Sequence, residues 1–197
     1  MDLGEAQYIL GIKIHRDRAN RLIGLCLDSY INKVLQRFRM NDSKKGNLPM
    51  RHGVQLSKSQ CPTTSAKMNK MKHIPYASAI GSIMYAMLCT RPDVSYALSA
   101  TSRYQANPGE SHCIAVKGIL KYLRRTKYIL LLYGGDDELV VTGIDASFQT
   151  NKVGSSVLVK FQTTEANVVK PFTKALPQAK HDERTANIGL RQMSQWC

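Results

Sequence analysis

The stretch PYASAIGSIMYAMLCTRPDVSYALSATSRY, residues 75–104, decides the fold of the helical part of this chain. Its side chains recur at helical spacing before and after a break at residues 90–93. The recurring positions are Tyr76, Ile80, Ile83, Met84 and Met87, and then Val94, Leu98 and Ser102. Pro92 suits the first position of a new helix, and Asp93 suits its first turn. The stretch predicts two packed helices and, by itself, no chemistry.

The residues before this stretch predict a hairpin, a helix and a long connector. Two strands are expected within residues 8–27, on apolar faces made by Leu10, Ile12 and Ile14 and by Ile23, Leu25 and Leu27. Asn20 lies in the polar turn between them and tolerates a left-handed backbone. Asp28 or Ser29 then begins a helix with an inner face of Ile31, Val34, Leu35 and Phe38. Residues 41–73 are polar and without periodicity, which favours a connector with short local structure at most.

A further helix is expected at about residues 112–126, where the apolar side chains are Val116, Ile119, Leu120 and Leu123. A second line of side chains on it is basic; we call Lys117, Lys121, Arg124 and Arg125 the basic stripe. The stripe is either a solvated surface or a face that follows a phosphate backbone. Strands are expected at residues 129–133 and 139–144, and an extended tail with a short helix at most at residues 171–197.

Charge is the strongest compositional feature of the chain. Its 28 Lys and Arg residues exceed its 14 Asp and Glu residues, which gives a net charge of +14. Such an excess favours a polyanionic partner, most commonly nucleic acid, over a merely soluble basic surface. The chain has no apolar run of about 18 residues and no signal-peptide pattern, so we expect no membrane partner and a location in the cytoplasm or nucleus rather than secretion. The five scattered cysteines predict reduced thiols and no zinc site.

Several segments, in the same order, resemble the Pol polyprotein of copia-type LTR retrotransposons. They are MDLGEAQYILGIKI (1–14), RLIGLCLDSYINKVLQRF (21–38), the stretch 75–104, HCIAVKGILKYLRRT (112–126), ELVVTGIDASFQ (138–149) and EANVVKPFTKALPQAKH (165–181). The resemblance implies an α+β fold with a β-hairpin and thumb- and connection-like helices, followed by a truncated ribonuclease H-like segment.

The implied organisation has four parts. Residues 1–40 would be the exit from the palm, a primer-grip-like hairpin and a helix, and residues 41–74 a connector. Residues 75–133 would be the thumb- and connection-like helices and a strand. Residues 134–197 would be a partial, internally deleted ribonuclease H-like region and the C-terminal tail.

The family copies RNA into DNA and degrades the RNA strand of the hybrid, with Mg²⁺ held by carboxylates. Its polymerase Asp-Asp turn lies upstream of the segment that this chain resembles. Asp145 matches the first metal ligand of the ribonuclease H domain and would be a vestigial metal ligand, whereas Lys170 stands where the family has its last catalytic Asp. Because a cation repels Mg²⁺, no intact catalytic set and no cofactor are expected for the isolated chain.

The resemblance and the charge together predict a reverse transcriptase and ribonuclease H polyprotein fragment that is inactive alone and binds RNA/DNA hybrid or duplex without sequence preference. The expected nucleic-acid-binding residues are the basic stripe and the hairpin arginines Arg16, Arg18 and Arg21. Two alternatives stay open. The chain is part of an active reverse transcriptase that uses an upstream or separately supplied palm, or it is an inert translated relic.

Overall fold

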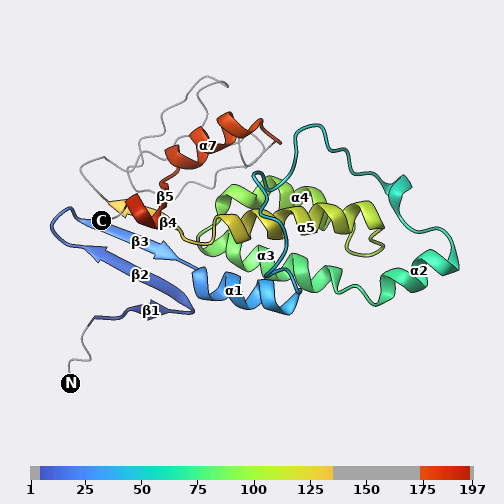
Figure 1. Ribbon diagram of the computed structural model, residues 1–197, viewed down its shortest axis with the longest axis horizontal. Helices are drawn as coiled ribbons and strands as arrows, with labels where there is room; N and C mark the ends of the chain where they lie inside the picture. Colours follow the sequence, from blue (N-terminus) through green and yellow to red (C-terminus); the bar gives the residue numbers. More distant parts are fainter. Residues whose placement is uncertain (1–4, 135–173, 196–197) are drawn as a thin grey trace, which may run out of the picture.

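The computed structural model describes residues 5–134 and 174–195, which combine a five-stranded sheet with a group of helices (Figure 1). The strands are β1 (Tyr8–Ile9), β2 (Ile12–Asp17), β3 (Leu22–Cys26), β4 (Ile129–Gly134) and β5 (Leu190–Gln192). The α-helices are α1 (Asp28–Arg37), α2 (Ser65–Lys72), α3 (Tyr76–Cys89), α4 (Ser95–Ser102), α5 (Glu110–Arg125) and α7 (Gln178–Asn187). Short 3-10 turns are η1 (Lys58–Gln60), η2 (Pro92–Val94) and η3 (Met193–Gln195).

The sheet is antiparallel throughout, in the order β1-β2-β3-β4-β5. The predicted hairpin is its N-terminal half, with Asp17 opposite Leu22. Strand β4, which follows α5 in the chain, pairs with β3 so that Leu131 lies opposite Leu25. The sheet therefore brings together the strand that leads into α1 and the strand that leaves α5. It lies at one end of the molecule (Figure 1).

The hairpin turn differs in detail from the sequence-based prediction. The left-handed residue is Arg21, with φ of 52°, rather than Asn20. The carboxylate of Asp17 explains the difference, because it accepts hydrogen bonds from the backbone N–H of Asn20 at 3.1 Å and from the Asn20 side chain at 2.7 Å. Leu10, expected on a strand face, instead lies in the tight β1–β2 turn with φ of 49° and is 86% exposed.

One hydrophobic core unites α1, α3, α4 and α5. The predicted helices are confirmed, and Ile83, Val94 and Ile119 are completely buried in this core. Pro92 begins η2 as expected, and α4 follows without a gap. The expectation for Met84 was wrong, because this side chain is 40% exposed on the outer face of α3. Its neighbour Ile83 occupies the core, and adjacent helical residues point about 100° apart.

The connector, residues 41–74, contains η1 and α2 and otherwise irregular backbone, as the sequence predicted. A tight corner fixes η1 against the start of α5. His112 accepts a hydrogen bond from the backbone N–H of Gly109 at 2.8 Å and stacks on Tyr104 with ring centroids 4.0 Å apart. A Cβ at Gly109 would lie 1.9 Å from the carbonyl oxygen of Gln60, so only glycine fits this approach.

The C-terminal segment is more ordered than the expected extended tail. Helix α7 has ten residues, and β5 pairs with β4 so that Leu190 lies opposite Leu131. Leu176, His181 and Leu190 are buried. The sequence predicted a short helix at most here, because this segment lacks a continuous apolar face and its burial depends on contacts with distant parts of the chain.

The fold class is confirmed as a mixture of helices with an antiparallel sheet. The ribonuclease H-like assignment depends on residues 138–170, so the expected strand at 139–144 and the residues Asp145 and Lys170 lie outside the described residues. Among the described residues, none of the helices has the length and apolar character needed to cross a bilayer.

The corner at Gly109 gives a stability prediction. Gly109→Ala should lower the free energy of unfolding by about 1–3 kcal/mol, because the added methyl group forces the backbone of η1 away from α5. Gly81→Ala is the matched control: its Cβ meets nothing within 4 Å in the exposed part of α3, so helix propensity should raise stability by about 1 kcal/mol. Urea unfolding of both variants measures the difference, and equal shifts would contradict the close approach.

Candidate nucleic-acid interface

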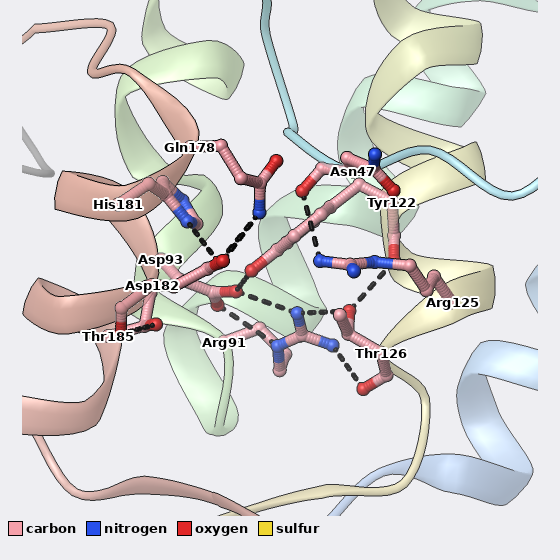
Figure 2. Close-up of polar contacts among 10 residues, drawn as sticks. All are labelled: Asn47, Arg91, Asp93, Tyr122, Arg125, Thr126, Gln178, His181, Asp182 and Thr185. Atoms are coloured by element: carbon pink, nitrogen blue, oxygen red, sulfur yellow. Dashed lines mark hydrogen bonds and ion pairs between the residues drawn. The ribbon is translucent and has the colours of Figure 1, made fainter.

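A buried ion pair at the break between α3 and α4 anchors the C-terminal turn of α5 (Figure 2). Arg91 donates to both carboxylate oxygens of Asp93, at 3.0 Å and 2.7 Å, and each residue is 1% exposed. The guanidinium also donates to the carbonyl of Thr126 at 3.0 Å and to its hydroxyl at 2.6 Å. Tyr122 donates its hydroxyl proton to Asp93 at 2.6 Å. The pair therefore fixes the end of the helix that carries the basic stripe.

Both members of this pair remain charged. Burial alone would raise the pKa of Asp93, but the charge of Arg91 and the hydrogen bonds from Arg91 and Tyr122 outweigh it and lower the pKa. Burial raises the pKa of the Tyr122 hydroxyl far above its usual value, and the Asp93 charge adds to this effect. Tyr122 is therefore a hydrogen-bond donor at all physiological pH values.

Helix α7 covers this network with His181, which is 4% exposed. The imidazole ring meets the Tyr122 ring edge-on, with centroids 5.5 Å apart. Within residues 5–134 and 174–195, neither ring nitrogen has a partner at hydrogen-bond geometry, and Nδ1 lies 3.8 Å from a carboxylate oxygen of Asp182. Burial lowers the pKa of His181 despite the nearby charges of Asp93 and Asp182, so the ring is neutral at pH 7.

The connector crosses the basic stripe of α5. Arg124 donates to the carbonyl oxygen of Ser43. Arg125 donates to the carbonyl oxygen of Asn47 at 3.1 Å, as Figure 2 shows. The backbone N–H of Gly46 donates to the carbonyl of Lys121 at 3.0 Å. Two of the four predicted phosphate-binding side chains thus also hold the connector on the helix.

A groove of about 970 Å³ lies between the connector and α5; we call it the connector groove. Four basic residues line it: Lys44, Lys45, Arg51 and Lys121. Its other lining residues are neutral, and none of the four cations has a carboxylate partner among the described residues. A cleft lined by one sign of charge concentrates counter-ions of the opposite sign, so this groove attracts anions.

The sequence-based site missed three of these cations. Lys44, Lys45 and Arg51 belong to the polar connector, which has no periodicity to predict where it lies. Residues 1–75 carry 14 basic and 5 acidic side chains, and this excess was the available signal. Only the tertiary fold, however, brings Lys44, Lys45 and Arg51 to Lys121. Lys117, by contrast, faces a different cavity beside the C-terminal end of α1.

The β2–β3 turn, residues 18–21, lies at the end of the sheet away from α3, α4 and α5 (Figure 1). Arg18 and Arg21 belong to this turn, Arg16 lies on β2 opposite Ile23, and none of the three lines the connector groove. Arg16 donates to the carbonyl of Ala6 at 2.6 Å, and Arg18 forms an ion pair with Glu5. Arg21 is exposed at the turn. The structure does not bring these residues together with the basic stripe, and their binding role stays a prediction.

The metal prediction concerns residues outside the described ranges. Asp145 and Lys170 are among them. Within residues 5–134 and 174–195, no three His, Cys, Asp or Glu side chains group closely enough to hold a metal ion.

Several known proteins similar to this chain are proteins of retrotransposons. It is 47% identical over 145 residues to the retrovirus-related Pol polyprotein from transposon TNT 1-94 of Nicotiana tabacum, a match that covers 74% of this chain and 11% of that protein. It is 31% identical over 141 residues to a putative transposon Ty5-1 protein of Saccharomyces cerevisiae, covering 72% and 44%. The Pol polyprotein from transposon RE1 of Arabidopsis thaliana is 33% identical over 125 residues, covering 64% and 8%. No family model and no solved structure matches.

These matches confirm the resemblance seen in the sequence. The chain is related to a segment of the retrovirus-related Pol polyproteins of copia-type retrotransposons. It spans less than half the length of each of these relatives, so the activities of the full polyproteins do not transfer to it directly.

Removing the negative charge of the buried ion pair should lower the stability of the fold strongly. Asp93→Asn should lower the free energy of unfolding by about 3–5 kcal/mol, because it leaves the Arg91 guanidinium buried without a counter-charge. Replacing both residues together, with Arg91→Met and Asp93→Leu, should lower the free energy of unfolding by less than Asp93→Asn alone, because no buried charge is then left without a partner. Urea unfolding of the three proteins tests this order, and a double variant less stable than Asp93→Asn would contradict it.

The neutral state of His181 predicts a pH dependence. The unfolded chain takes up a proton at this residue near pH 6.5, whereas the folded chain does so only at lower pH. Stability should therefore fall as the pH drops below about 6.5. His181→Phe keeps a ring against Tyr122 but cannot be protonated, so its free energy of unfolding should fall less over the same range. His52→Phe, in the exposed connector, is the control and should behave like the parent protein.

Proposed function

We propose that this chain is a nucleic-acid-binding segment related to retrotransposon Pol polyproteins, which contacts duplex or RNA/DNA hybrid through the connector groove without reading its sequence. The observation that carries the proposal is the convergence of Lys44, Lys45, Arg51 and Lys121 on one groove, which no acidic side chain from the described part of the chain lines. Lysine and arginine side chains of this kind neutralise phosphates and release condensed counter-ions.

The groove also offers groups suited to a sugar–phosphate backbone. Its neutral lining includes the amides of Asn47, Gln55 and Gln60 and the hydroxyl of Ser111. Such side chains hydrogen-bond phosphate and sugar oxygens and set the position of a duplex without reading base edges. Arg124 and Arg125 support the groove by holding the connector on α5.

We propose further that the chain alone carries out neither DNA synthesis nor hybrid cleavage. Both reactions require carboxylates that hold two metal ions, and the sequence has Lys170 where the resemblance implies a metal ligand. Asp145 would remain as a single, vestigial ligand. The ribonuclease H-like character of residues 134–197 belongs to this proposal. The alternatives are a part of an active reverse transcriptase with a separately supplied palm and an inert relic.

A salt titration tests the groove. Affinity for a primer–template duplex should fall steeply as salt rises, and Lys121→Ala should reduce the slope of log affinity against log salt by about one, equally for unrelated sequences. Lys67→Ala, on the exposed surface of α2, is the matched control and should leave the slope unchanged. Equal slopes for the two variants would mean that binding depends only on the net charge of the protein, and would contradict the proposal that the groove contacts the duplex.

Activity assays separate the alternatives. Absence of duplex binding at low salt would favour the inert relic. Mg²⁺-dependent degradation of an RNA/DNA hybrid that disappears in Asp145→Asn would overturn the proposed inactivity. Synthesis that appears only when a separate palm is added would favour the active assembly.

A further inference from the structure

A second cavity, separate from the connector groove, lies where the end of α1, the link between α2 and α3, and the middle of α5 meet. Its volume is about 460 Å³, within the range of about 300–1,000 Å³ that is usual for small-ligand sites. Buried apolar side chains form its floor: Met40, Tyr76, Ala79, Val116 and Leu120. Exposed basic side chains form its rim: Arg37, Arg39, His73 and Lys117.

The rim has a single sign of charge. No acidic residue lines the cavity, and Arg37, Arg39 and Lys117 have no carboxylate partner among the described residues. Cations without counter-charges around an apolar floor favour a ligand that is anionic at one end and apolar at the other. Arginine in particular holds phosphate, sulfonate and carboxylate groups with two parallel hydrogen bonds.

Arg39 occupies its place on the rim in a strained backbone conformation. Its φ is 54°, in the left-handed region, where it ends α1. The backbone N–H of Met40 donates to the carbonyl of Leu35 at 2.8 Å, and that of Arg39 donates to Gln36 at 3.0 Å. This is the helix ending in which glycine is the favoured residue. Arg39 therefore places a cation on the rim at a position where glycine would suit the backbone better.

We propose that this cavity binds an amphipathic anion, whose apolar body lies on the floor and whose single acidic group is held by Arg37, Arg39 and Lys117. The floor supplies the affinity for the apolar body, and the rim selects the charge. This site does not depend on nucleic-acid binding in the connector groove, so either proposal can fail without the other.

Fluorescence titration with anilinonaphthalene sulfonate tests the site directly in the full chain. This probe combines an aromatic body with one sulfonate, and it should bind at least about tenfold more tightly than the uncharged N-phenylnaphthylamine. Equal affinity for the two probes would show that the basic rim does not favour an anionic ligand, and would contradict the proposal.

Arg39→Gly separates binding from folding. It removes a rim cation and also relieves the left-handed strain, so the thermal midpoint should hold or rise while probe affinity falls about tenfold. Arg37→Gln, which keeps the backbone unchanged, should weaken the probe by a similar factor. Arg103→Gln, an exposed arginine at the end of α4 away from the cavity lining, is the matched control and should bind as the parent protein does. Loss of affinity in the control to the same extent would overturn the proposal, as would full affinity in both rim variants.

Competition identifies the acidic group. Dodecanoate and dodecyl phosphate should each displace the probe, and the tighter of the two shows whether a carboxylate or a phosphate is preferred. Dodecanol and inorganic phosphate should not displace it, because each supplies only half of the required chemistry. Displacement by inorganic phosphate alone would show that the cavity binds simple anions without an apolar body, and would contradict the proposal.

Discussion

The buried pair of Arg91 and Asp93 is the interaction on which the rest of the structure depends. Two charges removed from water are costly unless every donor and acceptor is satisfied, and here Thr126 and Tyr122 complete the set. The pair lies at the break between α3 and α4, yet its partners come from the last turn of α5. It therefore fixes both the angle of the helix pair and the point where the chain leaves α5 for the sheet.

The sequence predicted the elements whose formation depends on local pattern. Apolar side chains at helical spacing identified α1, α3, α4 and α5, alternation identified β2 and β3, and a short apolar run identified β4. It failed where burial depends on distant contacts. Helix α7 has a mostly polar sequence and is positioned by the packing of His181 on Tyr122, and β5 exists because β4 offers an open edge. The hairpin turn also differed, because the carboxylate of Asp17 decides its geometry.

In the candidate interface, too, the sequence predicted what depends on local pattern and missed what depends on distant contacts. Periodicity correctly brought Lys117, Lys121, Arg124 and Arg125 to one helix, but the crossing connector separates their surroundings. Lys121 shares a groove with connector lysines, while Lys117 belongs to the rim of the second cavity. Spacing along a helix cannot reveal such a crossing, because the hydrogen bonds that fix it go to backbone carbonyls of a segment without periodicity.

The position of α7 has a consequence for motion. This helix closes the buried network, and among the described residues it is attached by the His181 ring against Tyr122 and by the pairing of the three-residue strand β5 with β4. Segments held in this way open more readily than the core they cover. Opening of α7 and β5 as a unit would admit water to Asp93 and Tyr122 while α1, α3, α4 and α5 stay packed. The amide protons of β4 that face β5 should then exchange with solvent faster than those that face β3. Hydrogen exchange in β4 would therefore report both the free energy of this local opening and the free energy of unfolding of the rest of the fold.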